Sequence, residues 1–413
     1  MTVRLTVHRS AQEIGGNCIE IASSDGHRVL LDIGRPLNGI GEATTLLPAT
    51  LDLNAPPAAI LISHPHQDHY GLLQAAPSGW PVYSGAATEK LVKLTAAIVG
   101  DPITRDFNTW TSSRPFTIGP FTVTPFLTDH SAFDAYMLLI EVEGKRLLYS
   151  GDFRVHGRKA SLVTRFMAAP PPSIDVLLLE GTNLGADKPW MSENALEGEF
   201  WELFEQTSGR VFVAWSAQNI DRTVTLYRAC LKAHRTLVVD LYTAEVLELL
   251  AEYADLPQPE WKQIKVVITS TFADLYRAKG REEFVTRMAR HAIAAHHLNE
   301  TKPRWVIMTR KSLIRDYAAR NVTPGSDDAW CWSMWRGYLD GADGQAAKAW
   351  FDANGACACH LHTSGHASPD DLRGFAKAIQ AASIVPIHGA AWDTHADGFS
   401  AIRRLRDGEP LII

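Results

Sequence analysis

The segment LISHPHQDHYG, residues 61–71, concentrates four residues of the types that bind metal ions: His64, His66, Asp68 and His69. His64 and His66 lie two positions apart, so both imidazoles can face one ion, while Asp68 and His69 can face a second. Neutral imidazole and carboxylate ligands suit Zn²⁺, and Mn²⁺ or iron where oxygen ligands dominate. A single histidine is more often structural, but four such residues so close together favour a metal site.

Three further residues of metal-binding types follow β-type runs elsewhere in the chain. They are His130 after FTVTPFLTD, Asp152 after KRLLYSG and His388 after ASIVPI. The histidine segment itself follows an apolar run, AAILIS. Strands that end at one edge of a sheet bring such residues together, so we expect a single site. Asp152 is the natural bridge, because its two oxygens could hold two ions about 3.5–4 Å apart with a hydroxide between them.

Short strands in the first part of the chain are expected to position these residues. VRLTVHR, NCIEIAS and HRVLLDIG are β-type runs broken by Gly and Ser, and AYMLLIEVEG and DVLLLEGTN extend the pattern. After Trp190, strand-like segments alternate with longer helical ones, which predicts a separate α/β unit with a mostly parallel sheet. CACHLH, residues 357–362, alternates like a strand, and we expect it to return to the first domain rather than to form a second metal site.

The amino-acid composition limits the classes of protein to which this chain can belong. The chain has 413 residues, of which 46% are hydrophobic and 21% charged, and its formal net charge is −6. This profile is typical of a soluble globular protein with two domains or one large insertion. No apolar run approaches the roughly 20 residues needed to span a bilayer, and the N-terminus lacks the layout of a signal peptide, so we expect a cytoplasmic protein without membrane contact. The five scattered cysteines argue against a disulfide framework.

Together these motifs resemble those of the metallo-β-lactamase superfamily. The resemblance rests on Asp32 in LLDIG, the segment 64–69, His130 in TDHSAFDAY, Asp152 in SGDFR and His388 in PIHG. It implies an αββα sandwich with two divalent metal ions at the sheet edges. Asp32 would orient a ligand or the bridging water. The implied ligands are His64, His66 and His130 for one ion, Asp68, His69 and His388 for the other, and Asp152 for both.

Other residues resemble the β-CASP nucleases, the branch of this superfamily that includes ribonuclease J and the mRNA 3′-end-processing endonuclease. The similar motifs are SAQEIGGNC near the N-terminus, EGTN beginning at Glu180, TSGHAS at 363–368 and PIHG at 386–389. The resemblance covers nearly the whole chain and implies phosphodiester hydrolysis in a cleft between two domains. The implied domains are a metallo-β-lactamase fold in residues 1–188 and 356–413 and an inserted α/β β-CASP domain in residues 189–355.

Phosphodiester hydrolysis needs an activated water, neutralised phosphoryl oxygens and help for the departing 3′-oxygen. Two metal ions would supply the first two. His366 could approach the phosphate and donate a hydrogen bond or a proton, with Glu180 as the expected orienting carboxylate. Ser364 and Ser368 could contact phosphate but could equally have structural roles. The predicted catalytic residues are Asp32, Asp68, Asp152, Glu180 and His366, and the candidate substrate contacts in this loop are Ser364, Gly365, Ala367 and Ser368.

Charge is segregated along the sequence. Residues 262–320 carry thirteen Lys and Arg against five Asp and Glu, in a chain that is otherwise acidic. A basic stretch of this kind is often only the solvated face of a few helices. A nuclease with acidic metal ligands must also hold a polyanion, however, and the basic residues could contact it. Arg310 and Lys311, after the strand-like RWVIM, are the candidate phosphate contacts. The tryptophans of WCWSMWRGYL, residues 330–339, could stack bases, although core packing is the commoner role of such a run.

The sequence therefore predicts a metal-dependent hydrolase, a ribonuclease acting on single-stranded RNA through two divalent ions, Zn²⁺ or else Mn²⁺. A DNA-directed β-CASP nuclease is an alternative, since these residues distinguish neither RNA from DNA nor exonuclease from endonuclease. A small-molecule metallo-hydrolase would share the ligands but has no use for the insert, and an inactive scaffold would be expected to have lost ligands. Ribonuclease J proteins usually carry a further C-terminal domain that supports dimerisation, and because the chain ends 25 residues after His388, no oligomeric state is predicted.

Overall fold

The structure, a computed structural model, describes residues 2–100 and 102–413. The described residues form two compact units. The first unit consists of residues 2–96, 102–190 and 365–413, and the second of residues 97–100 and 191–364. Most of the second unit is thus a single insertion into the chain of the first.

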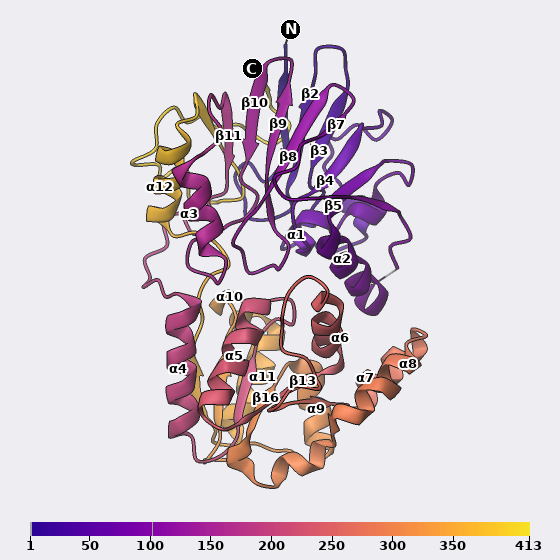
Figure 1. Ribbon diagram of the computed structural model, residues 1–413, viewed down its shortest axis with the longest axis vertical. Coiled ribbons are helices and arrows are strands. Elements are labelled where there is room, and N and C mark those ends of the chain that lie inside the picture. Colours follow the sequence, from indigo (N-terminus) through magenta and orange to yellow (C-terminus); the bar gives the residue numbers. More distant parts are fainter. Residues whose placement is uncertain (1, 101) are drawn as a thin grey trace. The chain divides into compact units, whose positions relative to one another are not determined.

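One sheet of the first unit has the strand order β20-β1-β2-β3-β4-β5-β6. Its strands are β1 (Arg4–Arg9), β2 (Cys18–Ala22), β3 (Arg28–Leu31), β4 (Ala59–Ile62), β5 (Val82–Gly85), β6 (Phe107–Trp110) and β20 (Pro410–Ile412). From β3 to β6 the strands run parallel. Strand β1 pairs with β20, so the two ends of the chain lie side by side at one end of this unit (Figure 1).

The other sheet of the first unit has the order β19-β11-β10-β9-β8-β7. Its strands are β7 (Phe116–Ile118), β8 (Phe121–Leu127), β9 (Tyr136–Val142), β10 (Lys145–Tyr149), β11 (Val176–Leu179) and β19 (Ser383–Pro386). Strands β7 to β10 form an antiparallel meander. Strands β11 and β19 add to it in parallel, so the strand that precedes His388 is brought beside the strand that precedes Glu180.

Alternating side chains place each sheet between two apolar layers, because successive residues of a strand point to opposite faces. Leu31 and Leu138 belong to the core between the two sheets. Leu30, one residue earlier, packs with Val92 on the helical side of the first sheet, and Leu139 packs on the helical side of the second. Figure 1 shows α3 and α12 beside the second sheet. The helices of this unit are α1 (Gln67–Tyr70), α2 (Ala86–Val99), α3 (Ala160–Ala168) and α12 (Pro369–Ile379), with 3-10 turns η1 (Ala43–Leu46) and η2 (Leu73–Ala75).

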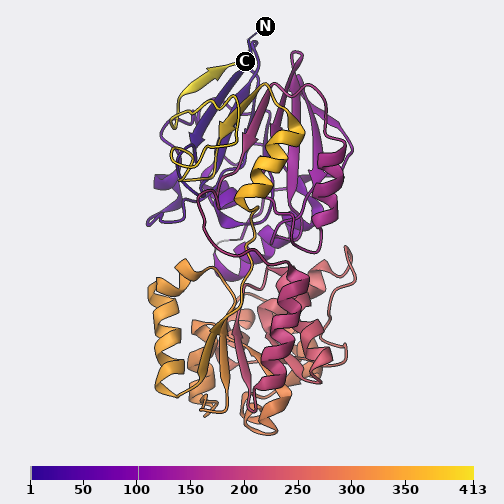
Figure 2. The same cartoon turned by 90° about the vertical axis from the view of Figure 1, so that its left-hand side faces the viewer.

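The second unit is built on a parallel sheet of order β15-β14-β13-β16-β12-β17-β18. Its strands are β12 (Val211–Ala214), β13 (Thr236–Asp240), β14 (Ile264–Val267), β15 (Ala292–Ile293), β16 (Trp305–Met308), β17 (Ala329–Trp332) and β18 (Cys357–His360). Crossover segments, most of them helical, join its strands, as a parallel sheet requires, and in both views helices lie on both sides of it (Figures 1 and 2). The helices are α4 (Glu193–Gln206), α5 (Ile220–Lys232), α6 (Leu241–Leu250), α7 (Ser270–Ala278), α8 (Glu282–Met288), α9 (Lys311–Ala319), α10 (Arg336–Asp340) and α11 (Ala342–Ala353), with η3 (Ala289–His291), η4 (Ala295–Asn299) and η5 (Lys302–Arg304).

The strand predicted at residues 357–362 is present, but it does not return to the first unit. Strand β18 pairs with β17 and forms an edge of the second sheet, and the first unit resumes at Gly365. The predicted domain boundaries, at residues 188/189 and 355/356, stay a prediction. The second boundary would place strand β18 in the first domain, whereas in the structure this strand belongs to the second unit. The helices in the described part of the chain are too short or too polar to span a lipid bilayer.

Candidate metal centre

The predicted ligands and the predicted orienting carboxylates, Asp32 and Glu180, lie after six strands of the first unit. These strands are rich in buried apolar residues, and the ligand-type residues follow the strand ends. Helix α1 holds Asp68 and His69 one turn beyond His66. The residues are Asp32 after β3, His64 and His66 after β4, His130 after β8, Asp152 after β10, Glu180 after β11 and His388 after β19.

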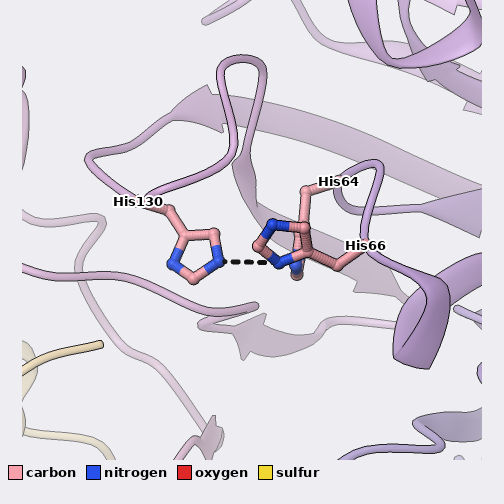
Figure 3. Close-up of side chains that lie close together, drawn as sticks. All are labelled: His64, His66 and His130. Carbon is pink, nitrogen blue, oxygen red and sulfur yellow. Dashed lines mark hydrogen bonds between the residues drawn. The ribbon is translucent and has the colours of Figure 1, made fainter. Parts of the chain in front are cut away.

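A first cluster joins His64, His66 and His130, whose ligand nitrogens lie within 4.8 Å of one another. Figure 3 shows the three rings converging, with Nε2 of His130 at 3.2 Å from Nδ1 of His66. His64 is fully buried, and its Nε2 has no hydrogen-bond partner in the part of the chain that the structure describes. Three imidazoles with one buried, unpartnered nitrogen fit a single metal ion.

A second cluster joins Asp68, His69, Asp152 and His388. Oδ2 of Asp152 lies 3.1 Å from Nε2 of His69, and Oδ2 of Asp68 lies 3.2 Å from Nε2 of His388. The same Asp152 oxygen is 3.7 Å from Nε2 of His64 in the first cluster. Oδ1 of Asp152 is buried without a hydrogen-bond partner among the described residues. Asp152 therefore stands where one carboxylate can serve both clusters.

Four of the histidines have one ring nitrogen held by an oxygen, which leaves Nε2 as the nitrogen that faces the cluster. Such hydrogen bonds fix the orientation and tautomer of metal-binding imidazoles. The pairs are His64 Nδ1 with Ser63 Oγ at 3.1 Å, His69 Nδ1 with Asp32 Oδ2 at 2.7 Å, His130 Nδ1 with the Gly365 carbonyl at 2.5 Å and His388 Nδ1 with Thr182 Oγ1 at 2.8 Å.

Asp32 organises the buried side of the second cluster. Its carboxylate is fully buried and accepts hydrogen bonds from Ser63 N and Oγ, from the Tyr149 hydroxyl and from Nδ1 of His69, at 2.6–2.8 Å. Its backbone φ is +61°, a left-handed conformation that Asp and Asn tolerate better than most residues. Asp32 thus turns Nε2 of His69 toward Asp152.

The environment keeps the first cluster neutral and the carboxylates ionised. Burial lowers the pKa of His64 and His130 well below the usual value and that of His66 to about 4. Burial would raise the pKa of Asp152, but neighbouring imidazoles outweigh it and hold this pKa well below its usual value. Neutral imidazoles and carboxylates are the protonation states in which these groups bind metals.

His366 lies beside the second cluster on the loop between β18 and α12. Its Nδ1 is 3.2 Å from Oε2 of Glu180 and 3.7 Å from Oδ2 of Asp152. Burial works to lower the pKa of His366, but the carboxylates of Glu180 and Asp152 outweigh it and raise the pKa to about 9. Glu180 is fully buried and also accepts from the backbone N–H groups of Phe153 and Thr182, so it is a fixed support for the ring.

The remaining predicted contacts have mixed surroundings. In the His366 loop, the Gly365 carbonyl holds His130, and a Cβ at this glycine would collide with the side chain of Ser131. Ala367 is buried in the core, and Ser368 caps helix α12 with a reciprocal hydrogen bond to Asp371. Ser364, the last residue of the second unit, is mostly buried. A substrate contact by Ser364, Gly365, Ala367 or Ser368 stays a prediction.

Arg310 and Lys311 lie in the second unit, at the start of α9. Arg310 is paired with the buried Asp240, 2.9 Å away, and Lys311 with the exposed Asp343. Neither belongs to the metal-ligand clusters. Their contact with a phosphate also stays a prediction.

Three residues around the clusters were not identified in the sequence analysis. Ser63 and Thr182 orient histidine rings, and the Tyr149 hydroxyl donates to Asp32. Two of them could have been found, since Ser63 directly precedes His64 and Thr182 follows Glu180 by two positions. Tyr149 is the last residue of an ordinary apolar strand, and only the fold brings it to Asp32.

Comparison with known proteins agrees with this geometry. Residues 12–181 match the metallo-beta-lactamase superfamily. The chain is similar to ribonuclease J of Helicobacter pylori, with 23% identity over 408 residues that cover 94% of this chain and 56% of that protein. Ribonuclease J of Mycobacterium tuberculosis is 24% identical over 359 residues, covering 80% of this chain and 58% of that protein. The chain thus spans little more than half the length of these relatives.

A solved structure of a protein of unknown function from Enterococcus faecalis has the same fold. It superposes with a TM-score of 0.79 over the whole of both chains, at 17% sequence identity. The predicted fold is confirmed: a metallo-β-lactamase αββα sandwich carries an inserted α/β domain of the β-CASP type. The predicted resemblance to ribonuclease J over most of the chain is confirmed as well.

Proposed function

We propose that this protein is a metal-dependent ribonuclease that hydrolyses phosphodiester bonds of single-stranded RNA. The similarity to ribonuclease J supports RNA as the substrate. The observation that carries the proposal is the pair of adjoining clusters, in which four imidazoles are each held at Nδ1 by an oxygen and turn Nε2 toward other ligand-type atoms. Nε2 of His64 and of His69 both lie near Oδ2 of the buried Asp152. A purely structural cluster would not be expected to leave Nε2 of His64 and Oδ1 of Asp152 buried without a hydrogen-bond partner, as they are among the described residues.

Two divalent ions would fit these residues. His64, His66 and His130 would hold one ion, Asp68, His69 and His388 the other, and Asp152 both. When bound, the ions would supply an activated water and neutralise charge on the phosphoryl oxygens. We propose Zn²⁺, with Mn²⁺ as the alternative, because imidazole nitrogens outnumber carboxylate oxygens in the set.

Three residues outside the proposed ligand sets would assist the reaction. Glu180 holds Nδ1 of His366, so that the opposite nitrogen, Nε2, can meet a substrate. At neutral pH a histidine with a pKa of about 9 is protonated and can donate a hydrogen bond or a proton to the departing 3′-oxygen. Asp32 would fix His69 against Asp152 throughout.

The substrate assignment is tested with labelled oligonucleotides of one sequence, made as RNA and as DNA with 5′-phosphate, 5′-triphosphate or 5′-hydroxyl ends. We expect the RNA to be hydrolysed and the DNA to be cleaved far more slowly, and product lengths separate stepwise removal from internal cuts. Faster cleavage of DNA would favour the DNA-directed alternative. Hydrolysis of a small lactone or ester without cleavage of either strand would favour a small-molecule hydrolase.

A prediction for Asp32 tests the support of the second cluster. Asp32→Asn keeps the size and tolerates the left-handed backbone, but its amide cannot accept all four hydrogen bonds. We expect metal affinity to fall by about 10–100-fold, the usual effect of removing a group that orients a ligand. Competition with a chelating dye measures this affinity, and Glu20→Gln, another buried carboxylate of the same sheet, is the matched control. Equal metal affinity in Asp32→Asn and the wild type would contradict this role.

A further inference from the structure

A second candidate site lies wholly within the second unit, where strands β12, β16 and β17 end. It is a pocket of about 710 Å³, within the usual range for small-molecule sites, and Ala214, Thr309 and Trp332 line its floor. The chain leaves β12 toward β13 on one side of the sheet order and leaves β17 toward β18 on the other. Open α/β sheets bind ligands at the carboxyl ends of their strands where the connections diverge in this way.

One wall of the pocket is cationic. Arg310, Lys311 and Arg315 line it, together with the carboxylate of Asp343. Arg310 is paired with the buried Asp240 and Lys311 with Asp343, so Arg315 is the cation of this wall for which no ion pair with a carboxylate is found among the described residues. Ser312 lies beside them in the first turn of α9, a helix of nine residues that no side chain caps among the described residues. The first N–H groups of such a helix attract anions, and the neighbouring cations add to this attraction.

The floor of the pocket holds an unused hydroxyl. Thr309 is 1% exposed, and its Oγ1 has no hydrogen-bond partner in the described ranges 2–100 and 102–413. A buried hydroxyl is destabilising unless something pairs with it. Because Thr309 directly precedes Arg310, the N-cap residue of α9, this hydroxyl and the helix N-terminus can serve the same anionic group.

Another part of the lining is aromatic and apolar. Met334 and Tyr338 join Trp332 of the floor in this aromatic wall. Tyr338 is 56% exposed and meets the 55% exposed Trp335 edge to face, with ring centroids 5.3 Å apart. Half-exposed aromatic rings at the rim of a pocket are surfaces on which nucleic acid bases stack.

We propose that this pocket binds a nucleotide, with its phosphate at the N-terminus of α9 and its base against the aromatic wall. The cationic wall and the Thr309 hydroxyl account for the phosphate, and the exposed ring of Tyr338 accounts for the base. The nucleotide could be free or could be one residue of an RNA strand. The site does not depend on the proposed ribonuclease activity, because it contains none of the metal-cluster residues.

The test measures binding rather than hydrolysis. Calorimetry with adenosine 5′-monophosphate, in the presence and absence of EDTA, separates this pocket from any binding at the metal centre. We expect one EDTA-insensitive site per chain, with much weaker binding of adenosine and of inorganic phosphate. Thr309→Val and Lys311→Ala should each weaken binding about tenfold, the scale of one hydrogen bond to a charged group.

Two controls keep the result interpretable. Lys348→Ala removes a lysine of α11 whose ion pair with Asp352 resembles that of Lys311 with Asp343, but Lys348 does not line the pocket, so binding should not change. Thr309→Val should melt at the same or a higher temperature, because the hydroxyl that it removes has no partner. If Thr309→Val keeps its melting temperature but loses binding, the loss of binding does not result from unfolding.

A short 5′-phosphorylated RNA that cannot be cleaved distinguishes the two sources of the nucleotide. If it binds more tightly than the mononucleotide and responds to Thr309→Val, the pocket holds a residue of the strand. A mononucleotide that binds as tightly as the RNA identifies a free nucleotide. The proposal is overturned if neither probe binds in EDTA, if both variants bind like the wild type, or if adenosine binds as tightly as its monophosphate.

Discussion

Replacing Asp152 by alanine is expected to abolish RNA hydrolysis and to lower the metal content of the protein. Oδ2 of Asp152 lies within 4 Å of His69 in one cluster and of His64 in the other, so the substitution removes a ligand from both. Metal-assisted hydrolysis should therefore fall by more than about 10³-fold. Elemental analysis after gel filtration gives the metal content, and cleavage of labelled RNA gives the rate.

A matched variant separates this effect from a general loss of stability. Asp134 is another buried carboxylate of the same unit, which accepts from the backbone N–H of Thr88 and belongs to none of the ligand clusters. Asp134→Ala should lower the melting temperature while the metal content stays at the wild-type level. Retention of both metal and activity in Asp152→Ala would rule out a shared carboxylate.

His366→Ala should reduce RNA hydrolysis by roughly 10²–10⁴-fold, the range for a positioned proton donor, while the metal content stays unchanged. The ring is held by Glu180 at 3.2 Å and is not needed to complete either of the proposed ligand sets. The change should lie mainly in kcat, because the donated hydrogen bond strengthens as charge develops on the departing oxygen.

Its control is His360→Ala, which removes a histidine of β18 that contacts the Met334 carbonyl and belongs to none of the ligand clusters. That variant should hydrolyse RNA at the wild-type rate. If His366→Ala lost metal along with activity, His366 would instead be a ligand, as its proximity to Asp152, Glu180 and His388 allows. Normal turnover in His366→Ala would leave hydrolysis to the metals alone.

The residues that the sequence analysis selected for the metal site share one property, which is their position after an apolar strand. His130, Asp152 and His388 are far apart in the chain, yet each follows a strand of the same sheet, and parallel or neighbouring strands bring their ends together. Residue type and strand position therefore indicated which side chains would lie close together, and the structure brings them into adjoining clusters. Their role as metal ligands stays a prediction. Residue type and strand position did not indicate the groups that orient the histidine rings and Asp32. A backbone carbonyl such as that of Gly365 cannot be recognised from residue type, and Tyr149 resembles any other strand residue.

Strand β18 shows a second limit of the sequence. The alternation in residues 357–362 predicted a strand, and the strand exists, but a period of two residues does not say which sheet a strand joins.

The nucleotide pocket shows a third limit of the sequence. Arg310, Lys311 and the tryptophans were noticed separately, and only the carboxyl ends of β12, β16 and β17 bring residues from Ala214 to Ala347 around one cavity.

Hydrolysis of RNA by two metal ions held in these clusters can be tested by a metal titration. The protein is stripped with a chelator, Zn²⁺ is added back in steps, and cleavage of a 5′-phosphorylated single-stranded RNA is measured beside the bound metal. We expect no cleavage by the stripped protein, and a rate that rises to a plateau at two bound ions per chain, one for each cluster. Full activity in the stripped protein, or no cleavage of RNA with both ions bound, would contradict it.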